Sequence, residues 1–289
     1  MLKLFTDTDC DITPEVAAKY GYGLISMPYS IDGETVYPYE DFDVFNARGF
    51  YDKLRAGALP NTSAISRERY KEIFEPYFAK GDDILYVHFS RAMTATFDAM
   101  DQAVAELKAL YPERNFYEID TKGITIVSYN IAREVGDMAL AGKTAEEILE
   151  WAKTEVDKFA IYFFADDLKF FKHSGRVSGL KATMGTLLGV RPIIYMSAAG
   201  KMDSIGSERG RARAIARLLA YVDELGEDIK SHRVIVGHSD APDIAEEVVR
   251  MLKDKYGEDL NIETVVVNPT TGGHCGPNGV GICYHAKHR

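Results

Sequence analysis

Largely apolar segments alternate along this chain with segments in which apolar residues recur at helical spacing. The stretch from Asp82 to Leu110 is the clearest case, because an apolar run over 84–89 breaks at Ser90 and reopens as a helical pattern. The apolar face of that helix is formed by Phe97, Met100, Val104 and Leu107. A repeated order of strand, turn and helix predicts an α/β fold with a mostly parallel sheet covered by helices.

The pattern changes near residue 158. Before it, strands and helices alternate, whereas two strands after it, at 193–196 and 202–205, are joined by the tight turn 199–201 and are expected to be antiparallel. A chain of 289 residues is long enough for two domains. We therefore expect an N-terminal α/β domain over 1–158, with a mostly parallel sheet, and a C-terminal α/β domain over 159–289, with a mixed sheet.

Composition excludes some classes of protein. A net charge of −10 opposes sequence-general binding of DNA or RNA, which requires a positive field, so we expect no nucleic-acid partner. No run of apolar residues approaches the length of a membrane span, and the N-terminus has no secretory pattern, so we expect a cytoplasmic protein. Three cysteines without CxxC spacing indicate neither a disulfide framework nor a zinc site.

Two hydroxyl groups stand in the turn after the strand at 84–89. Ser90 and Thr94 precede a helix whose first N–H groups are free, and ligands of α/β sheets collect at the carboxyl ends of strands. A carboxylate or phosphate could bind there. The alternative is that these residues only cap the helix, with Thr94 as its N-cap.

Two further loops carry polar groups suited to an anion. Thr62 belongs to a hydroxyl-rich loop at 61–66, and His274 stands in the middle of a glycine-rich segment at 268–281 that we expect to form a loop. A histidine in such a position can donate a hydrogen bond to an anion or transfer a proton. The alternative is a glycine-rich turn with an incidental histidine.

Three other patterns compete for a function. His274 and Cys275 with Cys283 and His285 suggest a metal site, but their spacing matches no usual ligand pattern, so we expect no metal. A strand followed by Gly-His-Ser-Asp-Ala resembles a nucleophile elbow, which leaves a serine-type acyl hydrolase using Ser239 and His274 as the alternative function.

The third pattern is a cluster of arginines. Arg209, Arg213 and Arg217 recur every four residues, with Arg211 beside them. In an acidic protein such a stripe can bind a phosphate or an acidic partner, or it can be an ordinary solvated helix face.

Taken in order, the motifs resemble the DegV family of bacterial fatty-acid-binding proteins over essentially the whole chain. The family patterns TDSTADL, TSQPS and SSGLSGTY are similar to residues 6–12, 62–66 and 90–97. GGRIS, LLxIKPIL, RGRxKA and GxHxGPGxxG are similar to residues 174–178, 187–194, 209–214 and 272–281. The chain departs from the family at Ala92 and Ala95, which replace glycines, and at Ala64-Ile65, which replaces Gln-Pro.

The resemblance implies two α/β domains that hold one long-chain fatty acid in an apolar tunnel between them, with no other cofactor. It implies that Thr62, Ser90 or Thr94, and His274 bind the carboxylate. It also implies a carrier that is not itself an enzyme: a separate ATP-dependent fatty acid kinase subunit phosphorylates the bound acid for phospholipid synthesis. Arg209 and Arg211 are candidates for contact with that kinase or with the acyl phosphate.

Overall fold

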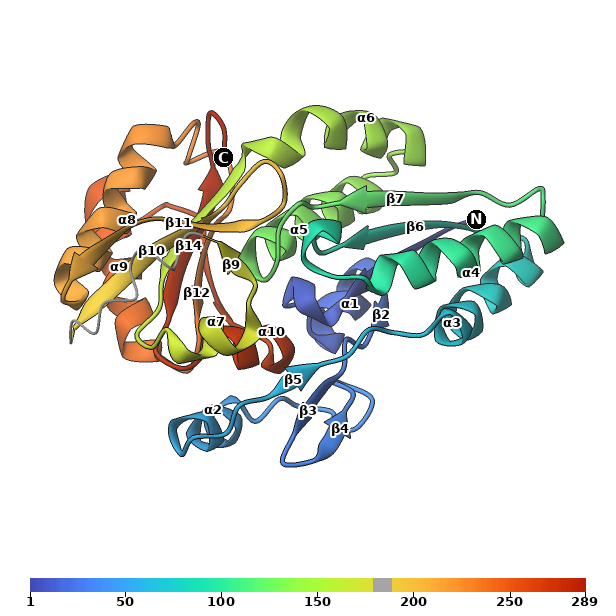
Figure 1. Ribbon diagram of the computed structural model, residues 1–289. Helices are drawn as coiled ribbons and strands as arrows, with labels where there is room; N and C mark the ends of the chain where they lie inside the picture. The colour runs from blue at the N-terminus through green and yellow to red at the C-terminus, as the bar shows by residue number, and fades with distance from the viewer. Residues whose placement is uncertain (179–188) are drawn as a thin grey trace.

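The computed structural model describes residues 1–178 and 189–289 and contains two principal β-sheets lying side by side (Figure 1). The first has four strands in the order β2-β1-β6-β7, and all its pairings are parallel. Its strands are β1 (Leu2–Asp7), β2 (Gly23–Ile25), β6 (Asp83–His88) and β7 (Phe116–Asp120). The carboxyl ends of β1 and β6 therefore lie next to each other at one edge of the sheet.

Helices cover this sheet: α1 (Pro14–Tyr20), α3 (Arg67–Lys80), α4 (Thr96–Leu110), α5 (Ile126–Leu140) and α6 (Ala145–Glu155). Their starts follow local sequence signals. The Thr13 hydroxyl accepts a hydrogen bond from Val16 N, with Pro14 in the first turn, and Thr144 and Glu147 form a capping box at α6. Short 3-10 turns follow β1, β6 and α6: η1 (Thr8–Cys10), η2 (Arg91–Met93) and η3 (Val156–Lys158).

One predicted helix start was wrong. Thr94 is not the N-cap of α4, because the turn η2 occupies the loop and the helix begins two residues later, with Ala95 in the capping position. Helix α2 (Ala47–Arg55) begins after Asn46, whose side chain accepts a hydrogen bond from Gly49 N.

A small third sheet, in the order β4-β3-β5, lies beside α2 at the bottom of Figure 1. It consists of β3 (Tyr29–Ile31), β4 (Glu34–Val36) and β5 (Asn61–Thr62), and both pairings are antiparallel. Strands β3 and β4 form a hairpin around the Asp32-Gly33 turn. Its third strand is the start of the hydroxyl-rich loop, and this pairing fixes the backbone at Thr62.

The second principal sheet is mixed and has seven strands in the order β13-β12-β14-β8-β10-β11-β9. Its strands are β8 (Phe159–Phe164), β9 (Val177–Ser178), β10 (Val190–Met196), β11 (Met202–Arg209), β12 (Val234–His238), β13 (Ile262–Val266) and β14 (Val280–His285). The antiparallel pairing predicted across the 199–201 turn is confirmed by β10 and β11. Residues 187 and 188, which the resemblance included, lie outside the described residues.

The helices described in this half are α7 (Lys169–Ser174), α8 (Arg211–Leu225), α9 (Pro242–Tyr256) and α10 (Pro269–Cys275). The prediction of a glycine-rich loop around His274 was wrong, because residues 269–275 are helical. Asn268 caps the helix by accepting from Thr271 N at 2.9 Å, and Pro269 occupies its first turn. Gly272 serves close packing, since a Cβ there would stand 2.3 Å from the Tyr51 hydroxyl.

One hydrophobic core extends across both sheets. Helix α5 contacts β6 of the first sheet and β8, β12 and β14 of the second, and Figure 1 shows it between them. Buried residues of both halves, such as Val87 and Ile161, belong to this same core. Within the described part of the chain, no helix combines the length and apolar character needed to cross a membrane.

Candidate ligand-binding site

A polar pocket lies at the carboxyl ends of β1 and β6, where α10 and β5 meet them. We call the following set of lining residues the polar pocket: Asp9, Met27, Thr62, Ser63, Phe89, Met93, Thr94, Thr96, Ile124, Arg176, Thr270 and His274. The empty space among their atoms, with the adjoining open solvent included, is about 450 Å³. The lining side chains come from sequence segments that are far apart, so the pocket is created by the fold rather than by one motif.

Thr62 and His274 lie together in this pocket. The Thr62 hydroxyl and Nε2 of His274 are 3.2 Å apart and form a hydrogen bond across the 212 residues that separate them in sequence. The pairing of β5 with β3 holds Thr62, and the last turn of α10 holds His274. Of the residues expected to bind a carboxylate, these two are joined directly.

His274 is largely buried, and burial lowers its pKa to about 4, with the positive charges of Arg176 and His173 acting in the same direction. The imidazole is therefore neutral near pH 7 and carries one proton. Its Nδ1 is buried and has no hydrogen-bond partner among the described residues. If Thr62 donates to Nε2, then Nδ1–H is a free donor at this position.

The two hydroxyls of the turn after β6 have different surroundings. Thr94 lines the polar pocket, and its Oγ1 accepts a hydrogen bond from Thr96 N at 3.1 Å, which leaves the hydroxyl proton free to donate. Ser90 is fully buried and donates to the carbonyl of Gly200 at 2.7 Å, while accepting from Ala92 N. The Ser90 proton is thus already engaged, and Thr94 is the better placed donor.

Sequence reasoning missed two charged residues of the polar pocket, Asp9 and Arg176. Thr6 and Asp7, the last two residues of β1, do not line this pocket, and Asp7 accepts from the Tyr86 hydroxyl and from Phe89 N. The available signal was position, because Asp9 follows the strand directly, in η1.

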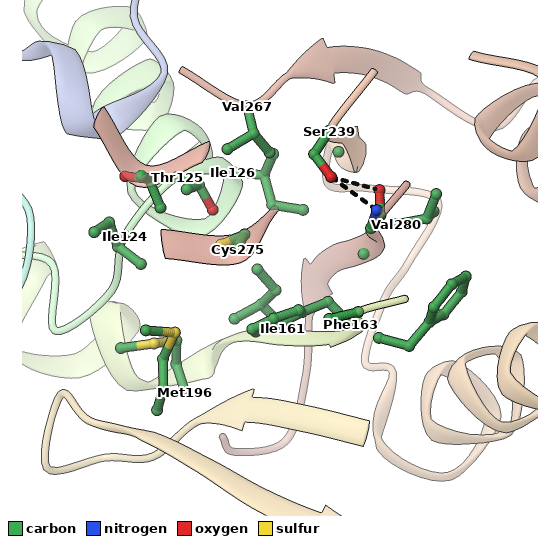
Figure 2. Close-up of a pocket in the computed structure, with 17 residues that line it drawn as sticks. Ile124, Thr125, Ile126, Ile161, Phe163, Met196, Ser239, Val267, Cys275 and Val280 are labelled. Carbon is green, nitrogen blue, oxygen red and sulfur yellow. Dashed lines mark hydrogen bonds between the residues drawn. The ribbon is translucent and has the colours of Figure 1, made fainter. Parts of the chain in front are cut away.

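A second cavity, almost entirely apolar, lies against the polar pocket, and Ile124 lines both. Figure 2 shows its walls, which come from α5, α10 and the second sheet. We call it the apolar cavity; its residues are Ile124, Thr125, Ile126, Ile161, Phe163, Phe164, Ala165, Met196, Met202, Gly237, Ser239, Val267, Thr271, Cys275, Gly279, Val280 and Gly281. The empty space among them, with the adjoining open solvent included, is about 540 Å³.

Helix α10 forms a wall shared by the two spaces. Thr270 and His274, four residues apart, face the polar pocket, and Thr271 and Cys275, again four apart, face the apolar cavity. Residues four apart share one face of a helix, so neighbouring positions serve different spaces. Burial raises the pKa of the Cys275 thiol to about 12, which keeps the wall of the apolar cavity uncharged at neutral pH.

The hydrolase alternative finds no catalytic arrangement at Ser239. Its Oγ accepts from Gly279 N at 2.7 Å, a bond drawn in Figure 2, and no hydrogen bond joins it to a histidine among residues 1–178 and 189–289. His238 instead accepts from Ala241 N, and His274 pairs with Thr62. Ser239 thus holds the backbone at Gly279, directly before β14, and α9 begins at Pro242.

The arginine cluster lies away from both spaces, at the end of β11 and the start of α8. Arg217 pairs with Glu208 at 3.0 Å, whereas Arg209 and Arg211 are exposed and form no ion pair within the described part of the chain. Across the same residues, no group of three or more His, Cys, Asp and Glu side chains is arranged to hold a metal ion.

Known proteins resemble this chain over its whole length. A DegV domain-containing protein of Clostridium perfringens is 27% identical over 274 residues, covering 94% of this chain and 93% of the relative. A solved DegV-family structure from Ruminococcus gnavus, described with vaccenic acid, is 20% identical with a TM-score of 0.85, covering 98% and 99% of the two chains.

Two further structures have the same fold. A stearic acid-binding protein from Eubacterium ventriosum is 20% identical with a TM-score of 0.85, and DegV of Bacillus subtilis, described as a fatty acid binding protein, is 22% identical with a TM-score of 0.83. Each covers 99% of this chain and is itself covered over 99% of its length. The family model described as "uncharacterised protein, DegV family" matches residues 1–287, so this chain belongs to the DegV family.

Proposed function

We propose that this protein binds one long-chain fatty acid, with the carboxylate in the polar pocket and the acyl chain in the apolar cavity, as a carrier and not as an enzyme. The observation that carries this proposal is the contact between an apolar cavity and a pocket in which Nδ1 of His274 is buried and has no hydrogen-bond partner among the described residues. The fatty acids named with the solved relatives support the same ligand class.

Burial of the acyl chain supplies most of the affinity. Each CH₂ group removed from water contributes about 0.8 kcal/mol, so a long chain in the apolar cavity binds tightly without any ion pair. The cavity wall suits this role because its hydroxyl groups are few and its one thiol is uncharged. The chain would lie between the domains that we place at 1–158 and 159–289.

The head group requires donors, because a buried carboxylate without hydrogen bonds is costly. In the proposed complex Nδ1–H of His274 and the Thr94 hydroxyl donate to the carboxylate, and Thr62 fixes the histidine tautomer by donating to Nε2. Arg176 adds a positive charge at the edge of the pocket. Ser90 supports the wall through Gly200 instead of touching the ligand.

We infer that the carrier presents this carboxylate to a separate ATP-dependent kinase subunit. Arg176 is an exposed residue of the polar pocket, and Arg209 and Arg211, which are exposed and form no ion pair among the described residues, offer positive charge for an acidic partner surface. The family relationship supports the inference. An exchange of this kind needs an accessible head group and a buried tail, and the exposed Arg176 lines the polar pocket whereas the walls of the apolar cavity are almost entirely apolar.

Mass spectrometry tests the central proposal. Purified protein is denatured and extracted, and the extract is searched for fatty acids; in parallel, protein stripped of lipid is titrated with vaccenic acid by calorimetry. We expect stoichiometric acyl chains in the extract, or one binding site in the titration. Absence of both would overturn the proposal, whereas binding of the methyl ester as tightly as the acid would overturn the head-group assignment.

A further inference from the structure

The pocket proposed for the carboxylate of the ligand already contains an acidic side chain of the protein. Asp9 lines the polar pocket and is 5% exposed. One carboxyl oxygen is 3.4 Å from the Thr271 hydroxyl, which donates to it, and no basic side chain pairs with Asp9 among the described residues. The backbone is fixed as well, because the Asp9 carbonyl accepts from Thr125 N at 2.7 Å.

The surroundings of Asp9 favour its neutral form. Burial raises its pKa well above the usual range, and the negative charges of Asp7 and Asp11, on either side in sequence, act in the same direction; the Thr271 bond opposes them. Asp7 and Asp11 are themselves buried acids, each with a pKa raised to about 7. Three buried acids therefore stand within five residues, and each ionised one makes ionisation of its neighbours less favourable.

Other elements add little charge to balance Asp9. From α10, His274 is neutral at pH 7 and Cys275 is a neutral thiol. From the segment before β9 comes Arg176, which lines the same pocket but is exposed. The start of α5 contributes Thr125, which does not titrate.

A ligand carboxylate in this pocket would meet Asp9. Two ionised carboxylates cannot share a buried site, but one proton between them forms a strong hydrogen bond from acid to carboxylate. The chain departs here from the TDSTADL pattern of its family, in which the residue that matches Asp9 is a threonine, a hydroxyl donor. A protonated aspartic acid also supplies a hydrogen-bond donor at this position, but only at a pH where it keeps its proton.

We propose that Asp9 is a ligand-binding residue that acts as a neutral acid, donating its proton in a hydrogen bond to the carboxylate of the bound fatty acid and making binding depend on that proton. The inference rests on the proposed function. At a pH where Asp9 is protonated in the free protein, binding takes up no proton. At a pH where Asp9 is ionised in the free protein, each binding event takes up one proton from solution, so affinity falls as pH rises.

Calorimetry with vaccenic acid tests this proposal in the full chain, between about pH 6 and pH 10 and in buffers of different ionisation enthalpy. For wild type we expect the Kd to rise toward about tenfold per pH unit, with uptake of one proton, on the alkaline side. Asp9→Asn keeps a donor of the same shape and cannot ionise. It should match the wild-type Kd at the acid end and show no proton uptake at any pH.

The outcomes separate this inference from the proposed function. Equal pH profiles for wild type and Asp9→Asn, or much tighter binding by Asp9→Asn at the acid end, would overturn the role of Asp9 and leave fatty acid binding intact. No binding by either protein would overturn the proposed function and this inference together. Asp9→Thr, which restores the family's hydroxyl, repeats the test if Asp9→Asn does not fold, as judged by thermal unfolding.

Discussion

The Ser90 hydroxyl donates a hydrogen bond to the carbonyl of Gly200 at 2.7 Å and so fastens the end of β6 to the turn between β10 and β11. The two residues lie in turns that follow strands of different sheets. Gly200 has a φ of 74°, and a Cβ on it would stand 2.3 Å from the Ser90 oxygen, so this contact requires glycine. Ser90 therefore joins the two sheets beside the polar pocket without lining it.

Ser90→Ala should lower stability more than it lowers affinity. The substitution leaves a buried carbonyl without its donor, which costs about 1–3 kcal/mol of unfolding free energy. The Kd for vaccenic acid should stay within about threefold of wild type, because Ser90 does not face the ligand. Urea unfolding and calorimetry measure the two effects. A loss of affinity without loss of stability would instead place Ser90 at the carboxylate.

Thr62→Val should have the opposite profile. Valine matches threonine in shape but cannot orient His274, so the hydrogen bonds to the carboxylate weaken. Loss of a bond to a charged group costs about 1.5–3 kcal/mol, equivalent to a 10–100-fold rise in Kd. Thr62→Ser, which keeps the hydroxyl, is the matched control and should bind nearly as wild type. Combining Thr62→Val with His274→Ala should add little beyond the larger single effect.

The sequence was sufficient for the architecture because the periodicity of apolar residues is a local property. The apolar run at β6 and the helical spacing in α4 predicted both elements and the parallel sheet. The sequence was a less reliable guide to α10, where the glycines suggested a loop. There the glycines serve contact with residues distant in sequence, such as Tyr51, and a tertiary contact of that kind has no local signature.

The candidate site was predictable only in part for the same reason. Thr62 and His274 were singled out by residue type and family pattern, and the structure brings them together. Asp9 and Arg176 were not singled out. In the sequence, an acid that the fold buries in a pocket cannot be distinguished from any other acid that follows a strand. What marks Asp9 as unusual is its burial, together with the lack of a basic partner within the part of the chain that the structure describes.

Asp7→Asn should change how stability depends on pH. Burial raises the Asp7 pKa from 3.8 to about 7 in the folded protein, so the native state holds a proton that the unfolded chain has lost. The stability that this proton provides is complete below the unfolded pKa and disappears as pH rises through the folded one.

Relative to Asp7→Asn, wild type should therefore lose on the order of 3 kcal/mol of unfolding free energy between about pH 5 and pH 8. Urea denaturation of both proteins at these two pH values measures the difference in their unfolding free energies. The contributions of groups that titrate equally in both proteins cancel in that difference. Asparagine can still accept from Tyr86 and Phe89. Unfolding curves that shift in parallel with pH would show that Asp7 is ionised in the native state.

Arg211→Glu should leave ligand binding intact and reduce phosphorylation of the bound acid by the proposed kinase subunit. Arg211 is exposed at the first turn of α8, where a glutamate is compatible with the helix dipole, so stability should not suffer. Arg250→Glu, on the exposed side of α9, makes the same change of charge elsewhere and is the control.

Acyl phosphate formation in a reconstituted reaction is the measurement for this pair. A several-fold loss with Arg211→Glu alone is expected, because a reversed charge repels an acidic surface as well as losing an attraction. If the two variants react at the same rate, the arginine cluster is an ordinary solvated face.

Ser239→Ala should weaken the fold without removing any activity. The Ser239 oxygen is the acceptor for Gly279 N at 2.7 Å, and alanine leaves that N–H without a partner, at about 1–3 kcal/mol of unfolding free energy. Hydrolysis of p-nitrophenyl esters should stay at the background rate in wild type and variant alike, because no histidine is hydrogen-bonded to Ser239 in the described part of the chain. If wild type hydrolyses these esters and Ser239→Ala abolishes the activity, the result would support the hydrolase alternative.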